Sequence, residues 1–220
     1  MRLEQTLQAI ETEKMSLPQI VNEAKEGRFT FPGQEMQAVV EKLLEVYPDN
    51  PEEIADVALH SGADTTALRV YEDNGLYEMA VTLAEEKGIG DPNRLRDKAI
   101  LHYEDGMMFV QAAELAEEYR FKGRAVTNYV RANDPENALR LCAELNDVDR
   151  GLEICENAQL FDRGAEFALK AGRIETALFY AERHAYTART FDLARTIATE
   201  HGLTDRVATY DHREHMLKKE

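Results

Sequence analysis

The chain has 220 residues, of which 44% are hydrophobic and 31% charged, with a formal net charge of −16. The excess of acid lies early: residues 1–90 carry 18 acidic and 7 basic side chains, whereas residues 161–220 carry 10 of each. This charge disfavours nonspecific binding of nucleic acid or of an anionic membrane. No apolar run approaches the roughly 18 residues that cross a bilayer. The first residues lack a secretory signal, and two cysteines suggest reduced thiols, so we expect a cytoplasmic protein.

Residues 1–39 are predicted to cap the chain with two helices. Apolar residues at i, i+4 and i+7 indicate an amphipathic helix in residues 1–15, and a second helix is expected to begin near Pro18 and end at Gly27. Phe29 and Phe31 then alternate with polar residues. A lone strand would have no partner in a helical chain, so we expect these aromatics to lie in a loop that covers the end of a repeat array.

From residue 40 onward, one pattern returns every 13 residues. A small residue opens each unit, and mostly apolar residues stand three, four and seven positions later, which is one face of an α-helix. Thirteen residues hold about nine in helix and three or four in a turn. We therefore predict an all-α solenoid, a right-handed superhelix of about 14 short antiparallel helices. Residues 40–214 form its repeat units, and residues 1–220 are predicted to be one domain.

The turns between units follow the same period. The eighth position after the opening residue is Gly or Asn in seven units, and both residues tolerate the left-handed conformation that ends a helix. These positions are Gly62, Gly75, Gly88, Asn133, Asn146, Gly172 and Gly202. Six extra residues, 89–94, interrupt the period and are predicted to bend the superhelix or to project a loop.

Two segments resemble the hinge of a tetratricopeptide-type repeat, in which a glycine, an aromatic or aliphatic residue and a small alanine let two helices pack closely. They are Gly75-x-Tyr77-Glu78-x-Ala80 and Gly172-x-Ile174-Glu175-x-Ala177. The likeness covers roughly residues 54–202. Two units here span 26 residues instead of 34, and the tryptophan-leucine-glycine signature is missing. The chain therefore resembles the broad tetratricopeptide-like superhelix class, closer to the short-hairpin arrays of vesicle-coat and intraflagellar-transport proteins.

Two groups of residues are candidate partner contacts. Met107, Met108 and Phe109 depart from the template, and methionine-rich surfaces suit adaptable peptide contacts, although these side chains would equally fill the gap beside the insertion. Basic residues gather in the middle of the chain, and Arg120, Arg124, Arg150 and Arg163 are the candidates among them. Such arginines either hold a carboxylate or phosphate of a partner, or pair with neighbouring acids of the chain itself.

No recognisable catalytic or metal site accompanies these groups. There is no P-loop, no GxSxG and no phosphate-binding glycine loop. Cys142 and Cys155 share a template offset at which other units have alanine, which indicates buried spacers. His212 and His215 form an i, i+3 pair, but two imidazoles alone are a weak metal site. We therefore predict no metal and no cofactor.

The leading prediction of function is a non-catalytic scaffold that binds a protein or peptide, by analogy with other solenoids. The alternative is an enzyme, or a regulatory subunit of one, whose site is assembled from scattered residues. A nucleic-acid-binding helical repeat is the third reading, and only the arginine-rich middle would support it. The charge distribution predicts that a basic segment of a partner meets residues 1–90, and that an acidic chain terminus meets the arginines. The partner and the oligomeric state do not follow from the sequence.

Overall fold

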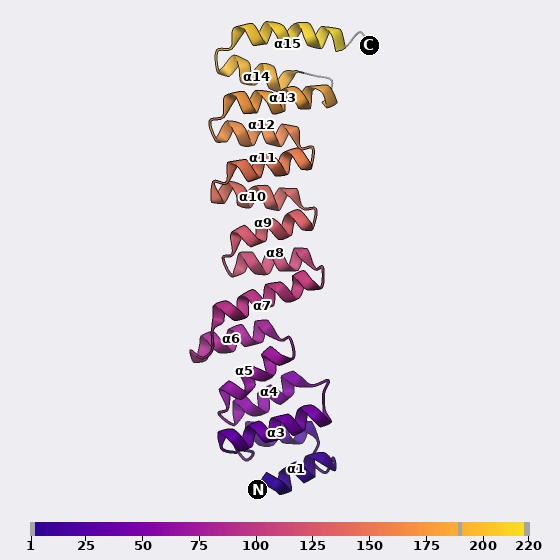
Figure 1. Cartoon of the computed structure of the whole chain (residues 1–220), viewed down its shortest axis with the longest axis vertical. Helices are drawn as coiled ribbons and strands as arrows, with labels where there is room; N and C mark the ends of the chain where they lie inside the picture. The colour runs from indigo at the N-terminus through magenta and orange to yellow at the C-terminus, as the bar shows by residue number, and fades with distance from the viewer. Residues whose placement is uncertain (1–2, 189–190, 218–220) are drawn as a thin grey trace. The chain divides into compact units, whose positions relative to one another are not determined.

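A computed structural model describes residues 3–188 and 191–217 of the chain. Within these ranges the protein forms fifteen α-helices and no strand (Figure 1). The prediction of an all-α helical-repeat fold is confirmed, with one helix more than the approximate number expected. Contacts between the helices divide the chain into two compact units, residues 1–106 and residues 107–220.

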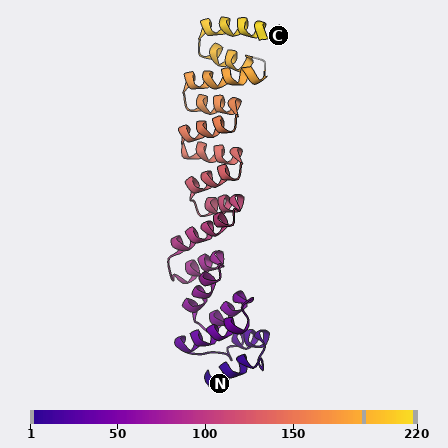
Figure 2. The ribbon, with the colours of Figure 1, turned by 45° about the vertical axis from the view of Figure 1, so that its right-hand side comes forward.

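The first unit combines an N-terminal cluster with a short stack. Its helices are α1 (Leu3–Glu11), α2 (Leu17–Lys25), α3 (Gly33–Val46), α4 (Pro51–His60), α5 (Asp64–Asp73), α6 (Tyr77–Lys87) and α7 (Pro92–Asp105). From α4 to α7 each helix packs against the next, whereas α1 packs on α3, and α2 on α4 (Figures 1 and 2). Residue 40, where the predicted repeat units begin, lies within α3, which starts at Gly33.

Phe29 and Phe31 lie in the loop between α2 and α3 and not in a strand, as the sequence predicts. Phe29 is 2% exposed, and its ring meets that of Phe31 edge-on at 5.2 Å between centroids. The backbone oxygen of Phe29 accepts a hydrogen bond of 2.8 Å from the hydroxyl of Ser61, which follows α4. This contact fastens the loop to the first turn of the stack.

The second unit is a simple stack in which each helix packs against the next along the chain. Successive turns lie on alternate edges of this stack (Figure 1). Its helices are α8 (Phe109–Glu118), α9 (Lys122–Arg131), α10 (Pro135–Leu145), α11 (Val148–Asn157), α12 (Phe161–Lys170), α13 (Ile174–Ala188), α14 (Asp192–Glu200) and α15 (Thr204–Leu217).

The buried face of each helix differs from the predicted one. Counted from the residue that opens each unit, offsets zero, three and four are buried in most helices of the repeat as expected, and offset one is mostly buried as well, for example Val126 in α9 and Leu139 in α10. Offset seven is wrong: Leu145 is 43% exposed, and Ala158 follows the end of α11 as its C-cap. A helix between two neighbours buries a wider arc than one stripe, and the seventh position falls on the last residue of α10 and on the C-cap of α11.

The left-handed turns are confirmed at all seven predicted positions, where φ lies between 54° and 75°. Three further residues adopt the same conformation at the same template position: Met107 (φ 56°), Arg120 (φ 66°) and Gln159 (φ 56°). Their side chains gave no signal in the sequence, because glycine and asparagine are the residues that usually mark such turns.

The inserted residues 89–94 do not form a projecting loop. Asp91 caps α7 by accepting hydrogen bonds from the backbone N–H groups of Asn93 (3.0 Å) and Arg94 (3.2 Å). Pro92 is the first residue of this helix, where its missing N–H costs nothing. The last three inserted residues, 92–94, therefore form the first turn of α7 and make this helix longer.

Candidate functional site

Two adjoining hollows flank Met79 on α6, and we call the pair the α6 groove. The first hollow, of about 310 Å³, lies between α6 and α7 and is lined by Tyr77, Glu78, Met79, His102 and Tyr103 among others. The second, of about 320 Å³, lies between α4, α5 and α6 and is lined by Leu59, Tyr71, Glu78, Met79, Thr82 and Glu86 among others. Glu78 and Met79 line both hollows, so the two lie next to each other on α6.

The first hollow exists because α7 departs from the burial pattern of the repeat. Offsets three and four are buried in most other helices, as Val70 and Tyr71 are in α5. In α7 the same offsets hold His102, which is exposed, and Tyr103, which is half-buried. A polar histidine at an offset that most units fill with an apolar residue was the signal in the sequence for this site, and sequence reasoning missed it.

Aromatic rings and one carboxylate line the first hollow. The ring of His102 meets Tyr77 edge-on at 5.7 Å and Tyr103 at 5.9 Å. The hydroxyl of Tyr103 donates a hydrogen bond of 2.6 Å to Glu78, which stands in the first turn of α6. This hydrogen bond, with a smaller effect of burial, raises the pKa of Tyr103.

The second hollow has an apolar floor and acidic surroundings. Tyr71 is only 6% exposed, and burial raises the pKa of its hydroxyl, with the charges of Asp56 and Glu52 on α4 adding to the effect. Glu86 lies at the exposed margin. Burial is the main cause of this upward shift in pKa, and the two carboxylates of α4 add to it.

The acids of the groove differ from their neighbours in having no cationic partner in the described part of the chain. Glu72 accepts hydrogen bonds from Arg94 (2.7 Å) and Lys98 (3.1 Å), and Glu85 accepts one of 2.6 Å from Arg96. No described lysine or arginine pairs with Glu78 or Glu86. Lys98 also lies over the ring of Tyr77, with its ammonium 5.9 Å from the centroid. The groove therefore keeps uncompensated negative charge beside aromatic rings.

The methionines predicted as partner contacts lie elsewhere, at the beginning of the second unit. Met107 is 79% exposed, and Met108, which precedes α8, is 38% exposed. The ring of Phe109 lies under the guanidinium group of Arg131, 5.5 Å from its centroid. None of these residues lines the α6 groove or the hollow of about 150 Å³ between α9, α10 and α11.

The predicted arginines are spread over four segments. Arg120 is exposed in the turn after α8, and Arg124 is half-buried in α9. Arg150 of α11 reaches back to α9, where it donates to the hydroxyl of Thr127 (2.7 Å) and to the carbonyl of Gly123 (3.3 Å). Arg163 of α12 forms ion pairs with Glu136 of α10 at 3.7 Å and with Glu166 of its own helix at 3.4 Å.

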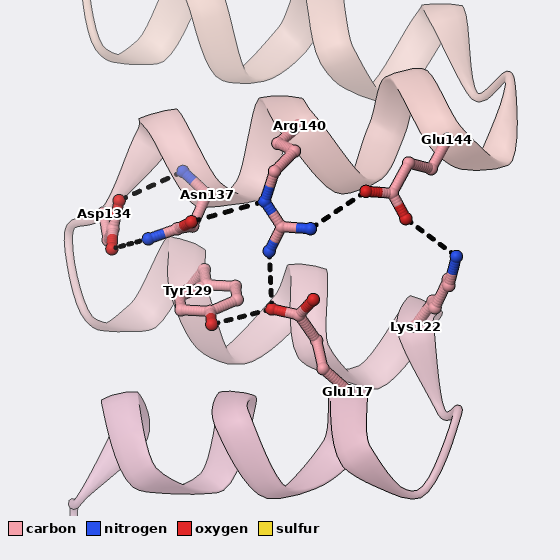
Figure 3. A network of polar contacts seen from close by, with 7 residues as sticks. All are labelled: Glu117, Lys122, Tyr129, Asp134, Asn137, Arg140 and Glu144. Carbon is pink, nitrogen blue, oxygen red and sulfur yellow. Dashed lines mark hydrogen bonds and ion pairs between the residues drawn. The ribbon is translucent and has the colours of Figure 1, made fainter.

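Arg140 lies at the centre of a polar network in which basic side chains pair with acids of the same chain (Figure 3). Arg140 of α10 donates to Glu117 of α8 (2.7 Å) and to Glu144 of its own helix (2.9 Å). Lys122 of α9 donates to Glu144 (2.7 Å), and the hydroxyl of Tyr129 donates to Glu117 (2.8 Å). The network ties three successive helices together, so these charges are used within the chain.

Similar pairs connect alternate helices further along. Arg173, at the start of α13, pairs with Asp149 of α11, and Arg183 of α13 pairs with Glu156 of α11. Arg206 of α15 donates to Glu175 of α13 at 2.7 Å. These three arginines therefore pair with acids of the same chain.

The two cysteines are buried, and the acids beside the C-terminal histidines pair with an arginine. Cys142 and Cys155 are free and fully buried, and burial raises the pKa of Cys155 to about 11. Near His212 and His215, the carboxylates of Asp211 and Glu214 both accept hydrogen bonds from Arg195. No group of three or more potential metal ligands occurs among the residues that the structure describes. No described helix has the length and hydropathy that a membrane span requires.

Comparison with known proteins adds little to this geometry. No protein-family model matches the sequence, and no curated protein matches it. Among solved structures, a de novo designed helical repeat protein is similar at 21% sequence identity, over 100% of each chain, with a TM-score of 0.15. A score this low carries no argument about arrangement or function.

Proposed function

We propose that this chain is a non-catalytic scaffold that holds a peptide segment of a partner protein in the α6 groove. The observation that supports this proposal is the pair of hollows, of about 310 and 320 Å³, on the two sides of Met79. Each volume is at the lower end of ligand sites, so each hollow suits one or two side chains. An extended peptide that crosses Met79 would place side chains in both.

The chemistry of the groove favours binding over catalysis. A general base or a nucleophile needs a pKa moved towards the working pH. The pKa of Tyr71 and that of Tyr103 are both raised instead, which keeps the phenols protonated as hydrogen-bond donors. Protonated phenols, exposed rings and a carboxylate are groups that recognise a peptide without reacting with it.

The tetratricopeptide-like relationship and the cytoplasmic location belong to the same proposal. The hinge segment that resembles a tetratricopeptide-type repeat supplies Tyr77 and Glu78 to the groove. Helical repeats commonly use such surfaces for protein contacts. Two free, buried thiols are compatible with a reducing compartment.

A peptide selection tests the proposal directly. A random peptide library displayed on phage is selected against the full chain, and the affinity of each enriched peptide is measured by fluorescence polarisation. Met79→Ala removes the apolar ridge between the hollows, whereas Met216→Ala changes an exposed methionine of α15 and serves as the matched control. We expect Met79→Ala to weaken binding about tenfold, as for a residue at the centre of an interface.

Met216→Ala should leave the affinity unchanged. Circular dichroism should show both variants folded, because each side chain is partly exposed in the wild-type chain. The proposal is overturned if no peptide is enriched, or if the enriched peptides bind the Met79→Ala variant as tightly as the wild type.

A further inference from the structure

Resting on the proposed function, we infer that the α6 groove selects basic peptide segments, in which two cationic side chains stand about four residues apart. One cation would meet Glu78 and the rings of the first hollow, and the other would meet Glu86. The residue between them would pack on Met79. The charges of the groove indicate the chemistry of the partner, whereas the shape of the groove alone does not indicate it.

Charge complementarity is the first argument. Glu72 and Glu85 form ion pairs with basic residues of α7, whereas Glu78 and Glu86 are not paired with any described lysine or arginine. Ionised carboxylates at the edge of a hollow attract a complementary charge. A peptide without cations would leave them uncompensated, and an acidic peptide would be repelled.

The aromatic lining is the second argument. Cationic side chains are attracted to the faces of aromatic rings. The chain already shows such a contact at this site, because the ammonium of Lys98 lies 5.9 Å from the centroid of Tyr77. Tyr103 donates a hydrogen bond to one oxygen of Glu78, Oε1, so the second carboxylate oxygen is available to accept from a partner's ammonium or guanidinium group.

The spacing follows from the geometry of α6. Glu78 and Glu86 are eight residues apart in this helix, which corresponds to a rise of about 12 Å along its axis. An extended peptide advances about 3.3 Å per residue, so about four residues cover the same distance. Met79 and Thr82 line the groove between the two acids, where the intervening apolar residue of the peptide would lie.

Three fluorescent peptides with the same flanking glycines and serines test the inference on the full chain. The first contains Lys-Ser-Leu-Ser-Lys, the second the same residues reordered as Lys-Lys-Ser-Leu-Ser, and the third Glu-Ser-Leu-Ser-Glu. Fluorescence polarisation at low ionic strength should give the tightest binding for the first peptide and none for the third. The reordered peptide separates the effect of spacing from that of charge alone.

Variants locate the charge effect within the groove. Glu78→Gln/Glu86→Gln should weaken binding of the first peptide about tenfold, as expected for the loss of two exposed ion pairs. Glu4→Gln/Glu35→Gln removes the same charge from exposed positions of α1 and α3 and should leave the affinity unchanged. Salt should slow association more than it speeds dissociation.

The inference is overturned if the double groove variant binds the first peptide as tightly as the wild type, or if the third peptide binds as well as the first. It is also overturned if the phage selection described above enriches neutral or acidic peptides whose binding depends on Met79. That last result would leave the proposed function intact, whereas a selection that enriches no peptide would reject the proposed function itself.

Discussion

The backbone of Gly151 in α11 lies against the ring of Phe167 in α12, so that a Cβ atom built on Gly151 would be 2.4 Å from Cε1 of Phe167. Gly164 and Tyr180 repeat this relationship in α12 and α13, with a corresponding distance of 2.6 Å to Cδ1. Both glycines open a unit, and both aromatics stand sixteen residues later. In α9 and α10 the opening residue is alanine and the residue sixteen positions ahead is aliphatic, namely Ala125 with Leu141 and Ala138 with Ile154. Ala194 with Tyr210, at the C-terminal end of the stack, does not follow this pattern. We infer that side-chain sizes are matched between successive helices from α9 to α13.

Size matching predicts that Gly151→Ala destabilises the chain, although alanine is the better helix former by about 1 kcal/mol. The added methyl group would overlap the ring of Phe167, and overpacking of this kind costs about 1–3 kcal/mol. Urea denaturation should show the loss, and Gly151→Ala/Phe167→Leu should recover part of it. A neutral or stabilising effect of the single substitution would contradict size matching.

A substitution of the opposite kind tests the left-handed turns. Arg120 and Gln159 occupy positions where five other turns of the repeat region have glycine: Gly62, Gly75, Gly88, Gly172 and Gly202. A side chain in this conformation costs about 1–2 kcal/mol, partly offset by the greater chain entropy of glycine. Arg120→Gly and Gln159→Gly should therefore each raise the free energy of unfolding by about 0.5–1 kcal/mol.

The reverse change, Gly172→Arg, should lower that free energy, and it serves as the control. Differential scanning calorimetry and urea denaturation would both report the three effects. Destabilisation by Arg120→Gly would instead show that the arginine side chain contributes more to stability than its backbone strain removes.

The buried cysteines should be unreactive in the folded chain. Burial raises the pKa of Cys155 to about 11 and also raises that of Cys142, so the reactive thiolate form is rare at neutral pH. A thiol-specific reagent at about pH 8 should label both residues only after unfolding in denaturant. Rapid labelling of either cysteine without denaturant would contradict the burial of this helix face.

The ion pairs of Glu72 should make stability depend on pH. The hydrogen bond from Arg94 lowers the pKa of Glu72 below its ordinary value of 4.5, against the effect of burial and with a further contribution from Lys98. A lowered carboxyl pKa contributes stability that is present above the unfolded-state value and is lost as the pH falls through the folded-state value. The difference in unfolding free energy between wild type and Glu72→Gln should therefore shrink below about pH 4.5. A difference that stays constant down to about pH 3 would exclude this contribution.

The period of 13 residues was sufficient to predict the helices and most turns, because burial of small residues and left-handed glycines repeat with the same spacing. It did not predict the burial of offset one, as at Val126, because the helical pattern was assigned to a single face. The turns at Arg120 and Gln159 were missed because neither side chain signals a positive φ.

The α6 groove depends on contacts that the sequence does not specify. Glu85 and Glu86 are adjacent acids in the chain, yet Glu85 pairs with Arg96 while Glu86 lines a hollow. His102 was visible as a polar residue at a usually apolar offset, but the histidines formed no cluster along the chain. Only packing between α6 and α7 brings it beside Tyr77.

Methyl NMR of the full chain labelled at its methionine ε-methyl groups tests the central claim, that the α6 groove binds a peptide. A peptide selected from the random library is titrated into the labelled protein. The account predicts that the resonance of Met79 shifts, while those of buried Met36 and of Met216 in α15 do not. Shifts confined to Met107 and Met108, with Met79 unchanged, would contradict it and assign binding to the surface at the start of α8 instead.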